Sequence, residues 1–437
     1  MRFWVTAGTL SLLASLSQAA DLPNAVTHAD FPPTDPDLVL LGRDLFFDPI
    51  LSGNRNIACA TCHHPSLASA DGMSLGLGEG AVALGADRHV DPTNAPQNRI
   101  PRNAPALFNL GAYEFTVFFH DGRVQTDPSA MYGVKMPAHA ELERPVPSPL
   151  AAQALMPPTS FDEMAGQDEE NPISVAARDK SFRGIGGVWD LLCKRIEEVP
   201  DYVARFEKHL NGRKLHFTDV ARAIAEFQTY EFQTINSPFD HYLRGDHFAL
   251  TDQQKAGMEV FYGEGNCASC HSGPFQTDHS FHAIGLPQFG PGKEEGSYAD
   301  KGRIAVTGDP EDRYRFRTPS LRNVAITGPY GHNGAYSDLA SMVRHHLQPI
   351  RSLASYDRGQ ARLHDVSVQA DDWGAMDDFD EVMRIAEATE IAPVNLTDQQ
   401  IDDLLAFLDA LTDPQAITGK LGAPDSVPSG LPMDALN

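Results

Sequence analysis

Two pentapeptides in this sequence have the residue types and the spacing needed to attach a haem covalently. Residues 59–63 read CATCH and residues 267–271 read CASCH, so a histidine directly follows each Cys-x-x-Cys pair. In c-type attachment the two thiols add to the haem vinyl groups as thioethers, and the adjacent imidazole binds the iron. The sequence therefore predicts two covalently bound haem c groups. The residues expected to hold them are Cys59, Cys62, His63, Cys267, Cys270 and His271.

Two other uses of these cysteines stay open from the residues alone. Four of the five cysteines lie in the pentapeptides, and Cys-x-x-Cys pairs also build zinc sites and redox-active disulfides. The histidine after each pair favours haem attachment over both alternatives. The fifth cysteine, Cys193, lies in the apolar helical pattern WDLLCKRI and is expected to be a buried free thiol.

Each pentapeptide follows a segment with helical spacing. Residues 41–49 (LGRDLFFDP) and 256–264 (AGMEVFYGE) share a glycine, an acidic residue, an aliphatic residue and an aromatic pair in register. This pattern predicts an amphipathic helix that leads into each haem loop. The sequence LTDQQ occurs at 250–254 and again at 396–400, where its threonine and second glutamine can form a capping box. The chain is therefore expected to contain two similar units.

The expected fold is mostly α, with two cytochrome c-like haem domains and long connecting loops. Residues Phe217, Val220, Ile224 and Phe227 repeat at helical spacing between the pentapeptides. Gly/Pro-rich stretches at 72–105 and 285–319 are typical of loops that wrap a cofactor. The expected boundaries are a secretory signal peptide at 1–20, an N-terminal domain at 21–236 and a C-terminal domain with a tail at 237–437.

Charge and hydropathy restrict the partners and the location. The chain has 34 basic and 59 acidic residues, a net charge of −25, which disfavours nucleic acid and anionic lipid and is compatible with a basic protein partner. Residues 1–20 combine Arg2, an apolar run and small residues at the end, typical of a signal peptide; an uncleaved anchor is the alternative. No later segment is long and apolar enough to predict a membrane span. The bulk of the chain is expected to be exported.

Together, the motifs resemble those of the bacterial dihaem cytochrome c peroxidase and MauG superfamily. The resemblance covers nearly the whole chain after residue 20. Besides the two pentapeptides, it rests on RNAPALFN (102–109), FFHDGR (118–123), FRTPSLRNVAITGPYGHNGAY (316–336) and TDQQIDDLLAFL (397–408).

The resemblance implies a peroxide-reactive haem in the N-terminal domain, with His63 as its proximal ligand. On the distal side the family uses a glutamine, a proline four residues later and a glutamate ten residues after the glutamine. In AAQALMPPTSFDEM these positions are Gln153, Pro157 and Glu163. A distal carboxyl can move a proton from the inner to the outer oxygen of peroxide, and the amide can orient the oxidant. These three residues form the expected catalytic set.

The position of the family's blocking histidine holds a different residue here. Many of the family's peroxidases carry a second histidine about sixteen residues past the first haem motif, which closes that iron until the other haem is reduced. The corresponding position is near Glu79. His64 is too close to His63 to bind the same iron from the opposite side. The first haem therefore resembles the open haem of MauG, with His89 as sixth ligand the alternative.

The resemblance implies that the C-terminal haem, bound through His271, is the electron-transfer centre. The family's sixth ligand lies fourteen residues past the histidine of HDG, as methionine in peroxidases and tyrosine in MauG. Counting from His332 gives His346, so a bis-histidine haem is implied. Such a haem generally has a lower potential than a His/Met haem. His345 and Met342 are the alternative ligands.

Two further features follow from the resemblance. The family holds a calcium ion between its domains with an Asn side chain and Thr and Pro carbonyls, which correspond here to Asn103, Thr327 and Pro329. The family also commonly places a tryptophan between the haems in WDGR, where this chain has His120. A tryptophan relay at that position is therefore in doubt.

Three functions remain open. The first is a periplasmic dihaem peroxidase that reduces hydrogen peroxide with electrons from a small cytochrome c or copper protein. The second is a MauG-like oxidase of a protein or small organic substrate, favoured by the missing blocking histidine and the altered axial ligand. The third is a plain electron-transfer cytochrome, in which Gln153 and Glu163 have no purpose. The family's peroxidases are often dimers, so a homodimer is one option.

Overall fold

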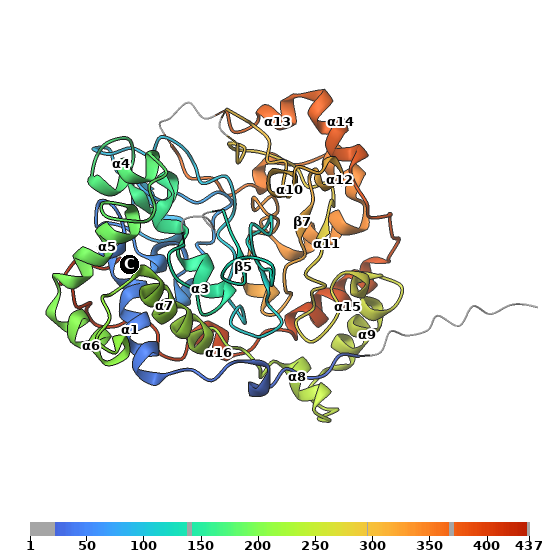
Figure 1. Cartoon of the computed structure of the whole chain (residues 1–437). Coiled ribbons are helices and arrows are strands. Elements are labelled where there is room, and N and C mark those ends of the chain that lie inside the picture. Colours follow the sequence, from blue (N-terminus) through green and yellow to red (C-terminus); the bar gives the residue numbers. More distant parts are fainter. Residues whose placement is uncertain (1–21, 138–141, 295, 367–370, 435–437) are drawn as a thin grey trace, which may run out of the picture.

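The computed structural model describes residues 22–137, 142–294, 296–366 and 371–434, and the predicted signal peptide lies outside them. Two lobes lie side by side, one coloured blue to green and the other yellow to red (Figure 1). The helices are α1 (Pro36–Phe47), α2 (Cys59–Cys62), α3 (Pro149–Ala154), α4 (Pro172–Arg178), α5 (Val188–Glu197), α6 (Pro200–Leu210), α7 (Phe217–Glu231), α8 (Pro238–Leu243), α9 (Asp252–Tyr262), α10 (Ile304–Thr307), α11 (Leu339–Leu347), α12 (Pro349–Ala354), α13 (Gly374–Asp377), α14 (Phe379–Glu387), α15 (Asp398–Asp409) and α16 (Gln415–Thr418). The prediction of a mostly α chain is confirmed.

The strands are two or three residues long, and all their pairings are antiparallel. β1 pairs with β2, β4 lies between β3 and β5, and β6 pairs with β7. The strands are β1 (Ala81–Val82), β2 (His89–Val90), β3 (Val117–Phe118), β4 (Val124–Thr126), β5 (Val134–Lys135), β6 (Phe281–His282) and β7 (Phe316–Arg317). They brace the loops that connect the helices.

Helices α1 and α7 cross at a glycine in the N-terminal lobe. The side chain of Asp35 caps α1 and accepts from the backbone N–H of Asp37 at 3.0 Å. At Gly42 a Cβ would stand 1.8 Å from the carbonyl oxygen of Ala223, so only glycine lets the two backbones approach this closely. Phe46 of α1 packs against Phe227 of α7 with 5.1 Å between ring centroids. Of this pair, α1 precedes the first pentapeptide, with the 3-10 turn Pro49–Leu51 between them.

Helices α9 and α15 repeat this arrangement in the C-terminal lobe. A Cβ at Gly257 would stand 1.8 Å from the carbonyl oxygen of Asp403, and the rings of Phe261 and Phe407 pack with centroids 5.3 Å apart. Both helices begin with the capping boxes predicted from the LTDQQ repeats. The prediction of a similar helix ahead of each haem loop is therefore confirmed.

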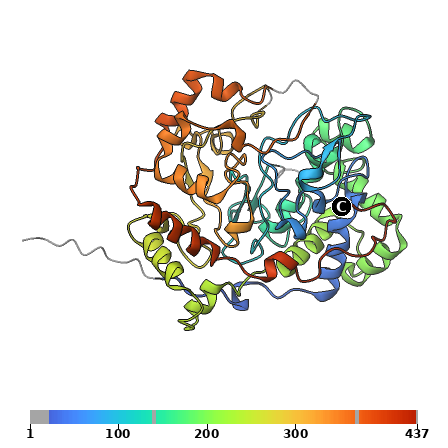
Figure 2. The same cartoon turned by 180° about the vertical axis from the view of Figure 1, so that it is seen from behind.

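Two apolar cores underlie the lobes. One contains most buried side chains from Val26 to Ile235, and the other runs from Phe239 to Leu411. The end of the chain departs from this order, because Ala416 and Val427 pack in the N-terminal core. In both views the C-terminus lies on the N-terminal lobe (Figure 2). The tail thus returns to the first unit. Phe275 of the C-terminal half also packs in the N-terminal core, so the two cores follow the predicted division at 236–237 only in part.

The two Gly/Pro-rich stretches are mostly irregular, as predicted, with α10 as a helical turn in the second. They connect the lobes. Ser74 Oγ donates to the carbonyl of Gly334 at 2.8 Å, and Arg99 pairs with Asp372 at 3.0 Å. Among the helices of the described ranges, none has the length and apolar character that crossing a bilayer requires.

Candidate functional site

The first pentapeptide forms the short helix α2, and its histidine is oriented from behind. The Nδ1–H of His63 donates to the carbonyl oxygen of Ser69 at 3.0 Å. Ser69 is itself fixed, because its Oγ accepts from the backbone N–H of Leu107 at 2.8 Å. Burial lowers the pKa of His63, so the ring is neutral. The Nε2 lone pair is thus left for a metal, which is the usual arrangement of a ligating histidine.

The second pentapeptide holds its histidine in the same way. The Nδ1–H of His271 donates to the carbonyl oxygen of Gln276 at 3.1 Å. Burial and the neighbouring His346 lower the pKa of His271 to about 4, so this ring is neutral as well. Ser269 Oγ donates to the carbonyl of Asn266 at 2.7 Å and stabilises the turn that carries the cysteines.

The four pentapeptide cysteines behave as two separate thiol pairs. All five cysteines of the chain lie in the described residues and none forms a disulfide. Burial raises the pKa values of Cys59 and Cys267 to about 12, which keeps them as thiols. A zinc site built from both pairs requires four converging thiolates, and no such group is present in the described residues. The thiol pairs fit thioether formation. Cys193 is buried on α5 without a disulfide, as predicted.

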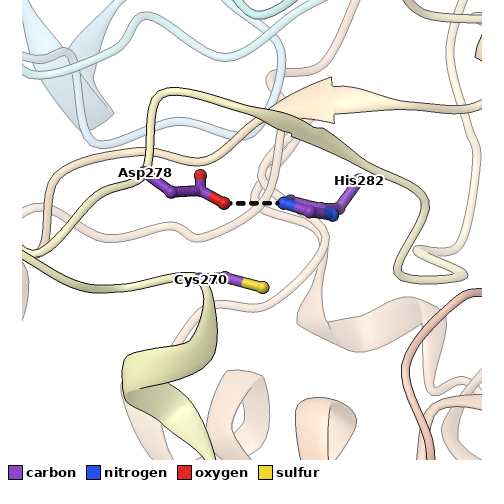
Figure 3. A group of neighbouring side chains, drawn as sticks. All are labelled: Cys270, Asp278 and His282. Carbon is purple, nitrogen blue, oxygen red and sulfur yellow. Dashed lines mark hydrogen bonds and ion pairs between the residues drawn. The ribbon is translucent and has the colours of Figure 1, made fainter.

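Cys270, Asp278 and His282 have potential metal-ligating atoms within 4.8 Å of one another (Figure 3). His282 Nε2 lies 2.9 Å from Asp278 Oδ2, and the two form a partly exposed ion pair. Since Cys270 is the cysteine expected to form a haem thioether, its sulfur is not free to act as a thiolate ligand. We therefore interpret these three residues as part of the second haem loop and not as a separate metal site.

Helix α11 places His346 opposite His271. The two ring centroids are 6.3 Å apart, with an interplanar angle of 59°. Two metal–imidazole bonds of about 2 Å, each extended by about 1 Å from nitrogen to ring centre, span about 6 Å. The Nδ1–H of His346 donates to the carbonyl of Met342 at 2.9 Å, which leaves its Nε2 free. The pair therefore fits one iron held between two imidazoles.

The neighbouring candidates have other contacts. His345 is fully buried, and its Nε2–H donates to the carbonyl of Ile284 at 2.8 Å. Its Nδ1 therefore accepts from the hydroxyl of Tyr336 at 3.0 Å, and both ring nitrogens are used. The side chain of Met342 packs in a small apolar cluster with Leu75 and Tyr336. Of the three candidates, His346 has the free nitrogen.

The predicted catalytic set lies on three consecutive short elements. Gln153 is on α3, Pro157 begins the 3-10 turn Pro157–Thr159, and Glu163 is on the π-helix Phe161–Ala165. All three side chains are half-buried. Trp189 of α5 fixes the turn between them, because its indole N–H donates to the carbonyl of Leu155 at 3.1 Å. Glu163 is also one of the charges that raise the pKa of the Cys62 thiol, so it lies within electrostatic range of the first haem loop.

Two basic side chains that were not predicted to belong to the site, Lys293 and Arg123, affect the pKa of Glu163. Burial raises the pKa of Glu163, while Lys293 and Arg123 oppose that shift. Arg123 pairs with Asp121 at 3.2 Å. Burial lowers the pKa of Lys293. Arg123 belongs to the FFHDGR motif at 118–123. Lys293 lies in the second Gly/Pro-rich stretch, and the prediction that this stretch wraps a cofactor was the one sequence signal that Lys293 lies near the site.

Glu79, at the position of the family's blocking histidine, and the two nearby histidines His64 and His89 all have other partners. Glu79 is buried, and its Oε1 accepts from the side-chain amides of Asn54 at 3.0 Å and Asn56 at 2.8 Å. His64 packs edge-on against the Phe47 ring, and its Nδ1 accepts from the backbone N–H of Ser66. His89, on β2, is exposed, and its Nδ1 contacts the carbonyl of Asp87 at 2.9 Å.

A buried charged group joins the two halves of the chain. Arg102 pairs with Asp300 from the C-terminal half and with Asp121, at 2.5 and 2.7 Å. The ring of His332 stacks on Phe316 with 3.7 Å between centroids. His120, at the position of the family's tryptophan, is near this group. Burial and Arg102 hold the pKa of His120 well below its ordinary value, so this ring is neutral.

The predicted calcium ligands come together in part. The Nδ2–H of Asn103 donates to the carbonyl oxygen of Pro329 at 2.8 Å. Its Oδ1 is buried and has no hydrogen-bond partner in the part of the chain that the structure describes. A buried amide oxygen without a partner is a hard ligand that calcium accepts, whereas the Pro329 carbonyl already accepts a hydrogen bond from the amide nitrogen of the same side chain. Thr327 ends the neighbouring 3-10 turn, two residues before Pro329.

Known proteins resemble this chain over most of its length. The family model described as di-haem cytochrome c peroxidase matches residues 36–248. The methylamine utilization protein MauG of Paracoccus denitrificans is 30% identical, over 92% of this chain and 95% of that protein. Cytochrome c551 peroxidase of Pseudomonas aeruginosa is 30% identical, over 74% of this chain and 75% of that protein.

One solved structure extends the similarity to three dimensions. The crystal structure of a MauG-like protein associated with microbial copper homeostasis aligns with a TM-score of 0.59. Its sequence is 25% identical, and the alignment covers 93% of this chain and 97% of that one. Both kinds of protein, peroxidases and MauG, are therefore among the relatives.

Proposed function

Because the chain belongs to the di-haem cytochrome c peroxidase family, which includes the MauG proteins, we propose that it is a periplasmic dihaem peroxidase. It reduces hydrogen peroxide at the centre held by His63. Electrons enter through the centre held by His271 and His346. Oxidoreductase chemistry with haem c is the shared property of the family; the specific reaction and the residue roles are our proposal.

The asymmetry between the two centres carries this proposal. His271 faces a second imidazole with a free nitrogen, 6.3 Å away between ring centroids, which suits electron transfer without substrate binding. The three-element segment of Gln153, Pro157 and Glu163 adjoins the first loop instead, and it offers polar groups that bind and protonate an oxidant. A plain electron-transfer cytochrome has no use for this second set.

The haem of the first centre, when bound, supplies the redox-active iron for peroxide reduction. Glu163 takes the proton of the inner peroxide oxygen and delivers it to the outer oxygen, so that the outer oxygen leaves as water. Gln153 orients the peroxide by hydrogen bonding. Lys293 and Arg123 stabilise the carboxylate form of Glu163, which is the form that accepts this proton.

The proposed location and partners follow from the sequence. The signal-like segment 1–20 indicates export, and c-type haem attachment is compatible with a periplasmic protein. The net charge of −25 favours a basic electron donor such as a small cytochrome c or copper protein. Asn103 and Pro329, with Thr327 as third ligand, hold a calcium ion between the lobes.

Low-temperature electron paramagnetic resonance of the oxidised, calcium-loaded protein tests the proposal. We expect one high-spin ferric signal from the His63 centre and one low-spin signal from the His271 centre. Replacing His346 with glycine should convert the low-spin signal to high-spin, whereas His345→Asn should leave it low-spin. Two low-spin signals in the unmodified protein would instead mean that a further side chain, such as His89, closes the first centre.

A MauG-like oxidase is the second candidate, favoured by Glu79 at the position of the family's blocking histidine. Its buried carboxylate is held by asparagine side chains. Turnover kinetics separate the two candidates. A peroxidase consumes peroxide continuously when reduced cytochrome c is supplied, whereas rapid reaction of the fully oxidised protein with peroxide, without turnover of that donor, identifies the oxidase.

A further inference from the structure

A continuous row of aromatic rings leads away from His346 through the C-terminal lobe. The centroid distances are 6.2 Å from His346 to His345, 5.2 Å from His345 to Tyr336 and 5.6 Å from Tyr336 to Tyr356. The row ends at Trp373, with 6.3 Å between its centroid and that of Tyr356. These are contact distances for packed aromatic pairs. We refer to these five residues as the aromatic row.

Hydrogen bonds hold the inner rings of the row in place. The hydroxyl of Tyr336 donates to Nδ1 of His345 at 3.0 Å, and that histidine is fixed from its other side by the carbonyl of Ile284. The hydroxyl of Tyr356 donates to the carbonyl of Ala335 at 2.5 Å. Rings fixed in this way keep their contacts, so the row is a persistent path through the lobe.

The outer end of the row reaches the surface. His345 and Tyr336 are buried, whereas Trp373 is partly exposed. The guanidinium of Arg358 lies 4.8 Å from the centre of the Trp373 ring. A cavity of about 310 Å³, lined by Arg99, Tyr298 and Asp371 among others, adjoins the segment that carries the tryptophan. Because the Trp373 ring is itself partly exposed, a small molecule can approach this end of the row without entering the protein core.

The composition of the row differs from ordinary core packing. Tyrosine and tryptophan lose an electron far more readily than phenylalanine, and electron tunnelling falls steeply with distance, so contacting rings transmit charge best. Another aromatic cluster of this lobe contains Phe239, Phe261, Tyr262 and Phe407 and is buried throughout. It offers no oxidisable residue at the surface.

We propose that Trp373 is a surface oxidation site at which a one-electron reductant of the phenol class is oxidised through the aromatic row. This inference rests on the proposed function, because peroxide is the oxidant. Each electron leaves the Trp373 indole and passes along the row toward the centre that His346 holds. The resulting indole radical cation takes an electron from the phenol, which releases its proton to solvent. Two phenols thus supply the two electrons and two protons that convert one peroxide to two waters.

The test maps the radical on the full-length mature protein with both haems attached. Peroxide is added in the presence of a nitroso spin trap, the protein is digested, and mass spectrometry locates the adduct. We expect the adduct on Trp373 in the unmodified protein, and a decrease of about tenfold or more at this peptide in Trp373→Phe and Tyr336→Phe. Tyr113→Phe is the matched control, because Tyr113 is an exposed oxidisable ring that lies outside the row and outside the cavity lining.

A second readout connects the site to its substrate class. The rate of hydroquinone oxidation should fall in Trp373→Phe and stay unchanged in Tyr113→Phe, while the low-spin signal of the His271 centre remains the same in both. The row is disproved if adducts form elsewhere and Trp373→Phe oxidises hydroquinone at the unmodified rate, even though peroxide still changes the haem spectrum. Absence of any spectral change with peroxide in the unmodified protein would overturn the proposed function, and the surface site with it.

Discussion

In the N-terminal unit α1 crosses α7 at Gly42, and in the C-terminal unit α9 crosses α15 at Gly257, each against a carbonyl oxygen. Behind each pentapeptide histidine a backbone carbonyl accepts from Nδ1. The side of each pentapeptide histidine that faces away from this carbonyl differs between the units. Gln153 and Glu163 adjoin the first haem loop, whereas His346 lies opposite His271 in the second. The repeated scaffold therefore fixes where an iron is held, and the non-repeated segments decide what that iron can do.

The largest expected effect concerns Glu163, the carboxylate near the first haem loop. Glu163→Gln keeps the shape of the side chain and removes the proton-accepting carboxylate. We expect the rate of peroxide cleavage to fall by about 10²–10⁴-fold, the range for general acid–base groups. Stopped-flow measurement of the change in the haem spectrum after mixing with peroxide gives this rate. Asp162→Asn is the control, because Asp162 is the neighbouring carboxylate on the same π-helix.

The pH dependence of that rate provides an independent check. Burial raises the pKa of Glu163 above its ordinary value. Because the carboxylate form accepts the proton, cleavage should be fast at high pH and slow as the pH falls through this raised pKa. The midpoint should therefore lie above about 4.3, the value of a free glutamate, and Glu163→Gln should abolish it. An unchanged pH profile in the variant would remove Glu163 from the proton transfer.

The next effect concerns the charged group that couples the two units. Asp300→Asn leaves the buried guanidinium of Arg102 with one carboxylate partner in place of two. Losing one partner of a buried ion pair costs about 3–5 kcal/mol, and urea unfolding of the haem-loaded protein measures it. The matched control is Asp425→Asn, an exposed carboxylate in the tail. A loss below about 1 kcal/mol, as for surface pairs, would contradict this role.

The Arg102–Asp300 pair also predicts how the free energy of unfolding changes at acid pH. Burial alone would raise the pKa of Asp300, but Arg102 outweighs it and the pKa is lowered. A carboxyl with a lowered folded-state pKa stabilises the protein above its unfolded pKa of about 3.9. That stabilisation is lost as the pH falls from this value toward the lowered pKa. Asp300→Asn should therefore unfold with a weaker pH dependence in this window.

Sequence reasoning predicted the repeated scaffold well, for a physical reason. Cys-x-x-Cys-His, the helix-period segments and the capping boxes are local patterns, and local geometry turns them directly into structure. The tail illustrates the opposite case, because nothing near Ala416 or Val427 in the sequence indicates which core they join. Lys293 is similar, since its effect on Glu163 depends on how a long loop closes between the lobes.

The candidate site was predicted in part from spacing to motifs. Counting fourteen residues from His332 reached His346, but only the structure distinguishes it from His345, whose ring nitrogens are both bonded. The aromatic row could not be predicted from the sequence, because Tyr336, Tyr356 and Trp373 lie on segments that only the folded lobe brings into contact with one another and with α11.

A smaller effect tests whether the two helix crossings are equivalent. Gly42→Ala and Gly257→Ala each place a methyl group against a backbone oxygen, which a close-packed crossing cannot accommodate without moving the helices. We expect each to reduce the free energy of unfolding by about 1–3 kcal/mol. Gln253→Ala on the exposed side of α9 is the control. Differential scanning calorimetry that shows a loss for one glycine only would show that the crossings are not equivalent.

The smallest effect concerns a contact that only the first pentapeptide makes. Thr61 Oγ1 donates to Asp434 of the tail at 2.6 Å, whereas the corresponding Ser269 bonds within its own turn. Asp434→Asn replaces a charged acceptor with a neutral one, so we expect a loss of about 1 kcal/mol in urea unfolding. Asp425→Asn, exposed in the same tail, should change less. Equal losses for the two variants would show that the tail acts through its net charge, and that the first haem loop is as self-supporting as the second.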